Sequence, residues 1–232
     1  MGDVVSYEMT DSVALITMDD GKANALTFDM FAQLGDAFDR AEADKAGVIL
    51  AGREGRFSAG FDLKILGAAG PETPPLLQAG FDLSHRMLSF PSPIVIACTG
   101  HAFAMGSFLL LSGDHRIGTA GDFKITANEV AIGMTMPRAA IEICRQRLTT
   151  NHFDRAVILA EVFTPETAIS AGFLDEVVAA EELIETAVRR AARLMTLDQR
   201  AHAATKLRAR AAMLDALRAA ILADDAEMRA LL

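Results

Sequence analysis

Two glycine-rich turns are the stretches of this sequence whose composition could support chemistry. One is GREGRFSAGFDL, at 52–63, and the other is GHAFAMGSF, at 100–108. Backbone N–H groups at a turn between a strand and a helix are free to bind an anion or an oxyanion that develops during a reaction. Ordinary turns are the alternative, because glycine is common wherever a chain reverses direction. Neither turn has the Lys-Ser/Thr ending of a phosphate loop or the spacing of a nucleophile elbow.

The elements that would position these turns alternate between strand and helix patterns. Strand-like apolar runs precede both turns, at 47–51 and 94–98, and a third lies at 13–18. Helices are expected at 28–44 after an N-cap at Thr27, around 76–89, over 104–113, and in most of the chain from 138 on, with an interruption near 172–178. The predicted buried face of the first helix consists of Phe28, Phe31, Leu34 and Phe38. This recurrence predicts an α/β domain of stacked βα or ββα units with a helical C-terminal extension.

The C-terminal helices suggest an assembly. We divide the chain into a core at 1–180 and a helical region at 181–232, which is rich in alanine and carries Leu and Met at helical spacing on more than one side. A helix that is apolar on several sides usually packs on something further. Oligomerisation is the favoured interpretation, and packing on the chain's own core is the alternative.

Composition excludes several classes of function. The chain has 232 residues, of which 51% are apolar, enough to bury a substantial core. Its 22 basic and 31 acidic residues give a formal net charge of -9, so no overall field attracts nucleic acid or anionic lipid. We therefore expect neither a nucleic-acid nor a membrane partner.

A cytoplasmic location is expected from the cysteines and from the N-terminus. Cys98 and Cys144 lie in segments that look buried and have no metal-site spacing, which fits a reduced compartment and no bound metal. The first ten residues show no signal or transit peptide. The segment 87–113 lacks formal charge, but Pro91 and Pro93 and the turn at 99–101 divide it into a buried strand and a buried helix.

Three motifs together resemble the crotonase superfamily, the family of enoyl-CoA hydratases and isomerases. They are GREGRFSAGFDLKIL, PIVIACTGHAFAMGSFLLLSGDHRIG and NEVAIGMTMP, in family order and with similar spacing, and the likeness runs from about Val13 to the region of Lys206. The resemblance implies a crotonase-like spiral of repeated ββα units and assembly as homotrimers or homohexamers. It also implies an acyl-CoA thioester substrate, so that coenzyme A is part of the substrate and no cofactor is permanently bound.

The same resemblance assigns the oxyanion hole to the N–H groups of Ala59 and Met105. Met105 departs from the family, which usually has glycine there. A methionine still supplies the N–H, but its side chain is expected to narrow the acyl pocket or shift the donor.

Hydratases of this family use two glutamates, and this chain has one of them. The second matches Glu129 in NEVAIG, whereas the first position holds Phe108, which exchanges no proton and is expected to pack in the core. A lone glutamate in a turn is usually solvated. Here Val130, Ala131, Ile132 and Met134 could place the carboxylate in an apolar pocket that raises its pKa toward neutrality, as a general base requires.

Further residues are assigned to coenzyme or substrate binding by the resemblance. They are Lys22, Ser58, Gly60, Asp62, Leu63, Lys64, Gly106, Phe108 and Lys206. Lys64 and Lys206 match positions that meet coenzyme phosphates, and Lys206 is a candidate for a contact across a subunit boundary; solvated lysines are the alternative. Asp62 and Asp114 are expected to be structural, and His101 a wall residue.

One carboxylate suffices for allylic isomerisation, in which a single base takes a proton from C2 of a 3-enoyl-CoA and returns it at C4. Hydration is easier with two carboxylates. The sequence therefore favours a Δ3-Δ2-enoyl-CoA isomerase with Glu129 as base. The alternatives are an enoyl-CoA hydratase and a catalytically silent subunit that binds CoA thioesters, the latter motivated by Phe108 and Met105.

Overall fold

A six-stranded sheet forms the centre of the molecule. The computed structural model describes residues 2–68 and 70–232. The strand order is β1-β2-β4-β7-β9-β11, with bounds Val5–Thr10, Val13–Met18, Gly47–Ala51, Ile94–Cys98, His115–Thr119 and Glu176–Val178. β1 and β2 pair antiparallel, and the remaining neighbours pair parallel. All residues of β4 and β7 are buried, as the continuous apolar runs predict.

Short strands complete the repeated units. β3 (Ala25–Leu26) pairs with β6 (Gly60–Phe61), and β8 (Gly100–Phe103) lies between β5 (Gly55–Ser58) and β10 (Ile125–Thr126). β4, β7 and β9 are each followed along the chain by one of these short strands. The predicted ββα organisation is confirmed. β1 and β8 were not expected from the sequence, in which 99–101 looked like a simple turn.

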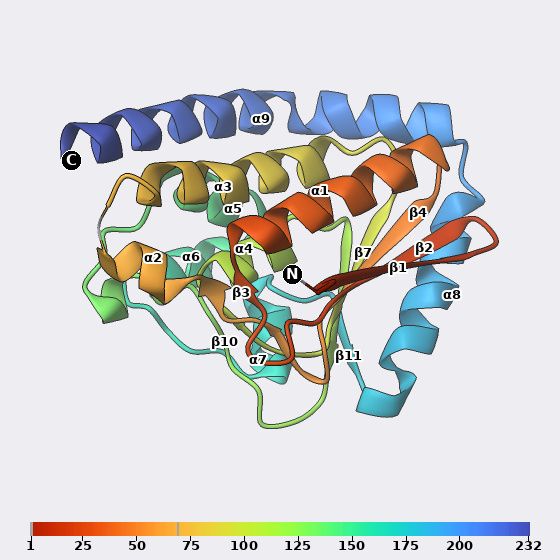
Figure 1. Ribbon diagram of the computed structural model, residues 1–232. Coiled ribbons are helices and arrows are strands. Elements are labelled where there is room, and N and C mark those ends of the chain that lie inside the picture. The colour runs from red at the N-terminus through yellow and green to blue at the C-terminus, as the bar shows by residue number, and fades with distance from the viewer. Residues whose placement is uncertain (1, 69) are drawn as a thin grey trace.

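Helices cover both faces of the sheet and carry a further layer (Figure 1). Their bounds are α1 Phe28–Ala43, α2 Leu63–Ala68, α3 Thr73–Ser89, α4 Met105–Leu111, α5 Arg138–Arg147, α6 Thr150–Val157, α7 Pro165–Ala171, α8 Leu183–Met195 and α9 Gln199–Ala230, with 3-10 turns η1 Val130–Ile132 and η2 Ala180–Glu182. α9 runs along the outside of α3 and α5, and α8 packs on β4 and β7. None of the helices in the described part of the chain is both long and apolar enough to span a membrane.

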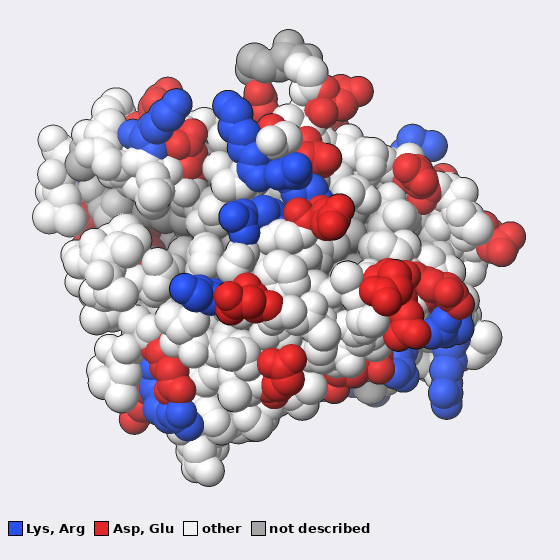
Figure 2. Space-filling model, turned by 90° about the horizontal axis from the view of Figure 1, so that it is seen from below, with Lys and Arg blue, Asp and Glu red and all other residues white. Residues whose placement is uncertain are grey.

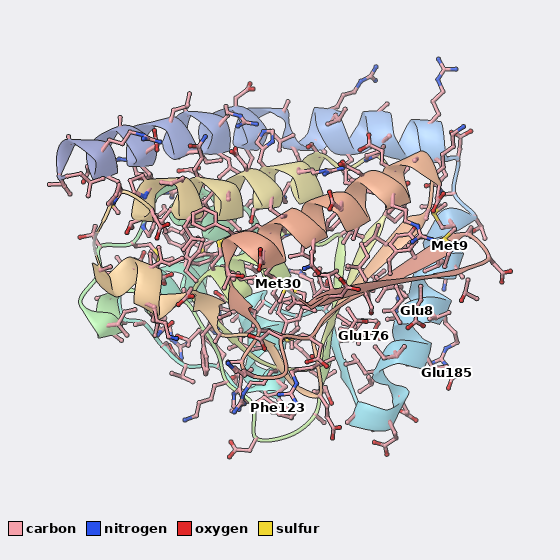
Figure 3. The ribbon with its side chains drawn as sticks, viewed as in Figure 1. Glu8, Met9, Met30, Phe123, Glu176 and Glu185 are labelled. Carbon is pink, nitrogen blue, oxygen red and sulfur yellow. The ribbon has the colours of Figure 1, made fainter. Side chains whose placement is uncertain are left out.

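Alternation along the central strands creates two cores. Val48 and Leu50 of β4 face the core beneath α1, α3 and α4, and Ile49 and Ala51 face the smaller core beneath α8. Successive side chains of a strand point to opposite faces, so a strand that is apolar at every position packs helices on both. Side chains fill the space between α1 and the sheet, where Met30 lies (Figure 3).

The first helix begins as predicted. The Thr27 side chain accepts a hydrogen bond from the N–H of Met30 at 3.1 Å, which caps the helix. Phe31, Leu34 and Phe38 are buried, but Phe28 is 38% exposed, so its assignment to the buried face was wrong. Phe28 is the first residue of α1, and the buried face of the helix begins at Met30.

The C-terminal helices bury their inner faces on the chain's own core. Leu214, Leu217 and Ile221 of α9 are buried, while Leu207 and Leu222 remain 46% and 60% exposed. The structure thus shows α9 packed on the chain's own core, which is the alternative given above. Oligomerisation stays a prediction. On the face of the molecule shown in Figure 2, basic side chains lie beside acidic ones, in keeping with the net negative charge.

Candidate active site

In the first glycine turn the N–H of Ala59 is already hydrogen-bonded, contrary to the expectation. The N–H of Ala59 donates to the carbonyl of Ala23 at 3.0 Å, so it is not available to an oxyanion. Ser58, assigned above to substrate binding, is buried; its hydroxyl donates to the Asn24 carbonyl at 2.8 Å and accepts from the Gly60 N–H at 3.1 Å. Ala59 and Ser58 therefore hold the turn in place, and the expected role of Ala59 is corrected.

Phe61 supplies the free donor in this turn. The N–H of Asp62 pairs with the Leu26 carbonyl on β3 at 3.2 Å. Because N–H groups alternate in direction along a strand, that of Phe61 points away from β3, which is the only strand paired with β6 in the described residues. It meets no acceptor among the residues that the structure describes. Sequence reasoning missed Phe61, because the donor depends on which residue of the turn pairs with β3.

The second turn presents the N–H of Met105. Met105 is the first residue of α4, so its N–H has no acceptor inside the helix. The preceding residue, Ala104, has φ 47° and ψ -124° and donates its own N–H to the Thr126 carbonyl at 3.0 Å. Such a conformation costs about 1–3 kcal/mol at a non-glycine residue and persists only where the surroundings hold it. The strained turn aims Met105 N–H outward from the helix, as its predicted role requires.

Two glycines let the turns approach each other. A Cβ on Gly60, whose φ is +87°, would lie 2.9 Å from the Phe103 carbonyl oxygen and 3.3 Å from the Met105 nitrogen. A Cβ on Gly106 would lie 2.6 Å from the Ser58 carbonyl oxygen. Any side chain at either position would force the turns apart. The two turns that carry the N–H groups of Phe61 and Met105 therefore lie in direct contact.

Glu129 is buried and has a free carboxylate oxygen. It precedes η1, is 5% exposed, and its Oε2 is buried without a partner in the described part of the chain. Burial raises the pKa of Glu129 to about 7, and a hydrogen bond from its own backbone N–H offsets this only in part. The burial and the raised pKa agree with the expectation for a general base.

The residues that bury Glu129 differ from those expected. Val130 and Ile132 are 45% and 49% exposed. Cys144 of α5, whose raised pKa owes part of its shift to the charge of Glu129, lies beside it instead. Glu129 is thus buried by tertiary packing against α5 and not by its neighbours in sequence.

A cavity of about 280 Å³ opens between α3, the segment after η1 and the end of α9. Its lining residues are Pro74, Leu77, Gln78, Phe81, Met134, Thr135, Met136, Pro137, Arg138, Ile221, Asp224, Asp225, Glu227, Met228 and Leu231. The N–H of Met134, one of the lining residues, donates to the backbone carbonyl of Glu129 at 2.9 Å, so the cavity lies close to the Glu129 main chain. Its mostly apolar walls suit an acyl chain.

Phe108 lies one layer behind this cavity. It is fully buried, and its ring stacks on Phe81 with centroids 6.3 Å apart and planes at 28°. Phe81 lines the cavity, whereas Phe108 does not. The expected core packing of Phe108 is confirmed, and its assignment as a substrate contact stays a prediction.

The amine of Lys206 is bound by groups of the same chain. Its side chain is 4% exposed, and its Nζ lies 2.6 Å from Asp114 Oδ2 and donates to the carbonyls of Phe90 and Ser92 at 2.9 and 3.0 Å. Arg210 Nη2 pairs with the other Asp114 oxygen at 2.9 Å. Desolvation lowers the pKa of Lys206. The expected contact of Lys206 with a coenzyme phosphate is therefore corrected: the amine ties α9 to the end of α3 and to Asp114, which has the structural role expected.

Asp114→Asn is predicted to lower the free energy of unfolding by about 3 kcal/mol, because it leaves the buried Lys206 and Arg210 without their counter-charge. Urea unfolding measures the change. The control is Asp225→Asn, which should cost under about 0.5 kcal/mol, since Asp225 pairs with Arg229 of the same helix, at 2.8 Å, and with no other basic side chain in the described residues. Equal losses in the two variants would refute the structural role of Asp114.

The remaining assigned side chains lie at the surface. Lys22, Leu63 and Lys64 are exposed, and the Lys64 N–H donates to Asp62 Oδ1 at 2.8 Å, which places Asp62 at the start of α2. The coenzyme contacts stay predictions. His101 Nδ1 accepts from the Lys124 N–H at 3.0 Å, and desolvation, then Arg56 and Lys124, lower its pKa, which suits a neutral wall residue.

Comparisons with known proteins agree with this geometry. A family model described as enoyl-CoA hydratase/isomerase matches residues 8–230. A solved enoyl-CoA hydratase/isomerase family protein from Pseudomonas syringae is 48% identical with a TM-score of 0.95, covering 97% of this chain and 98% of its own. The apo enoyl-CoA isomerase of Mycobacterium tuberculosis is 49% identical with a TM-score of 0.94, covering 98% and 100%. A probable enoyl-CoA hydratase from Mycobacterium avium is 28% identical over 207 residues, 88% of this chain and 80% of that protein.

The chain belongs to the enoyl-CoA hydratase/isomerase family, within the crotonase superfamily. Its relatives are named both as hydratases and as isomerases, which confirms the expected class of enzyme and leaves the reaction open. Within residues 2–68 and 70–232, no group of three or more His, Cys, Asp and Glu side chains is arranged to hold a metal ion.

Proposed function

We propose that this protein is a Δ3-Δ2-enoyl-CoA isomerase. The thioester carbonyl accepts hydrogen bonds from the N–H groups of Phe61 and Met105. Glu129 removes a proton from C2 of the 3-enoyl-CoA, and the electron pair of that C–H bond delocalises onto the thioester oxygen as a dienolate. The protonated Glu129 then returns the proton to C4 as the double bond moves to C2–C3. No proton is gained or lost overall.

One observation carries the proposal. Among the described residues, Glu129 is the one carboxylate with a buried oxygen that lacks a hydrogen-bond partner, and the position of a second carboxylate is taken by Phe108. A base with a pKa near neutrality exchanges a proton readily in both directions. The experiment is incubation of the purified protein with 2-enoyl, 3-enoyl and 3-hydroxyacyl thioesters. Conversion of 3-enoyl to 2-enoyl substrate supports the proposal, and dominant formation of 3-hydroxyacyl product favours a hydratase.

Activity should depend on pH through Glu129. The base acts only when ionised, and its pKa is raised from 4.5 to about 7, so kcat/KM should reach half its maximum near pH 7. Below that pH it should fall about tenfold per unit. A rate profile between pH 5 and 9 on a 3-enoyl-CoA measures this. A profile that stays flat down to pH 5 would remove Glu129 from the role of base.

We also propose the assembly, coenzyme use and location that the resemblance and composition favour. These are a homotrimer or homohexamer, coenzyme A carried only by the substrate, and a cytoplasmic enzyme. The exposed Leu207 and Leu222 on α9 support further packing of that helix. Light scattering should give a multiple of three times the 24.8 kDa chain mass. A monomer at micromolar concentration would contradict the assembly.

A further inference from the structure

The last turns of α9 form one wall of the cavity described above. Ile221 and Met228 lie seven positions apart on one helix face and line the cavity, and Leu231 lies beyond them, 78% exposed. The spacing from Ile221 to Leu231 is about 15 Å along the helix axis. Met228 is half-buried against the main core. An acyl chain that occupies this cavity therefore meets the side chains of the last turns of α9.

Asp224 fixes the position of this wall. Its Oδ2 accepts from the Ala139 N–H at 2.9 Å, and its Oδ1 accepts from the Arg138 N–H at 3.2 Å and lies 3.0 Å from Arg138 Nη1. These N–H groups open α5, which has no side-chain cap from its own N-cap residue. Arg138 Nη2 also pairs with Glu227 at 2.6 Å. A carboxylate from α9 thus caps α5, and the cap favours negative charge at a helix N-terminus.

We infer that Met228 determines acyl-chain length and that Asp224 is a positioning residue that holds Met228 in place. This inference rests on the proposed acyl-CoA function. The wall is apolar on its inner side, so a neutral straight chain fills the cavity up to the Met228 thioether. The polar part of the lining consists largely of ion-paired groups, because Asp224 and Glu227 pair with Arg138, and Asp225 pairs with Arg229.

Binding of saturated straight-chain acyl-CoA thioesters, measured by calorimetry, tests the inference without requiring turnover. In the wild type, affinity should rise roughly fourfold per added methylene until the chain reaches Met228, and then stop rising. Met228→Ala removes about three heavy atoms and should move this break to chains about two carbons longer. Met228→Phe should move it to shorter chains. Asp224→Ala should make the point at which affinity stops rising less sharp, because the Arg138 and Ala139 N–H groups lose their acceptor.

Two matched controls separate the wall from general effects on α9. Met213 is also half-buried on α9 but does not line the cavity, so Met213→Ala should leave the break unchanged. Asp215→Ala should likewise leave it unchanged, since Asp215 is an exposed carboxylate of α9 that does not line the cavity. If acyl-CoA thioesters bind, and in both Met228 variants the affinity stops rising at the same chain length as in the wild type, the inference is overturned and the proposed function stands. If no acyl-CoA thioester binds the wild type, both are overturned.

Discussion

Glu129→Gln is expected to reduce isomerase turnover by about 100-fold or more while acyl-CoA affinity stays near that of the wild type. Glutamine preserves the shape of the side chain but cannot accept the proton from C2. Single-turnover kinetics on a 3-enoyl-CoA and calorimetric binding of a saturated acyl-CoA measure the two quantities separately. Turnover near the wild-type level would show that another group is the base.

The same substitution should stabilise the protein at alkaline pH. The folded state holds a proton on Glu129 up to about pH 7, whereas the unfolded chain releases it near pH 4.5. The folded state therefore binds more protons in this window, and the free energy of unfolding falls as the pH rises through it. Glutamine has no charge to desolvate, so at pH 8 the variant should gain roughly 2–3 kcal/mol. Urea unfolding at pH 5 and pH 8 checks this; an equal difference between the proteins at both pH values would contradict the buried ionised carboxylate.

Phe108→Glu is expected to raise hydration of 2-enoyl-CoA relative to isomerisation. The substitution removes the ring that stacks behind Phe81 and places a second carboxylate on α4, one turn beyond the Met105 N–H. Two carboxylates can orient a water molecule and supply the α-proton. The loss of the buried ring should cost about 3 kcal/mol or more, and one of the two carboxyl groups should hold a proton.

The control for Phe108→Glu is Phe108→Leu, which loses bulk without adding a carboxylate. The ratio of 3-hydroxyacyl-CoA to positional isomer is measured on the folded fraction of each variant. A higher ratio in the Glu variant alone supports the view that the missing carboxylate sets the reaction. Equal ratios in the two variants, or a wild type that hydrates as fast as it isomerises, would contradict it.

The fold was largely predictable because its signals are local. The apolar runs of β4 and β7 and the capped, periodic α1 depend on neighbouring residues, and a strand that is apolar at every position must be covered on both faces. β8 escaped notice, since Gly100–Phe103 has too few apolar residues for a strand pattern and is held by pairing with β5 and β10. The surface against which α9 packs could not be predicted either, because the spacing of apolar residues does not identify what a helix packs on.

The site was predictable in its residue types and less so in its donors. Glu129 and Met105 follow from motifs. Phe61 and not Ala59 has the free N–H because of hydrogen bonds to the carbonyls of Ala23 and Leu26, some 35 positions away in sequence. No local pattern reveals these bonds. The structural role of Lys206 was not predictable from local sequence either, because its buried partner Asp114 is remote in sequence and a lysine normally lies in solvent.

The most direct test of a single-carboxylate mechanism follows the proton itself. A 3-enoyl-CoA carrying deuterium at C2 is converted by the wild-type protein in ordinary water, and the 2-enoyl product is examined by mass spectrometry at low conversion. Glu129 is 5% exposed, so it should deliver a measurable share of the deuterium to C4 before exchange with solvent. A product without deuterium at C4, at any conversion, would contradict the transfer of one proton by one buried base.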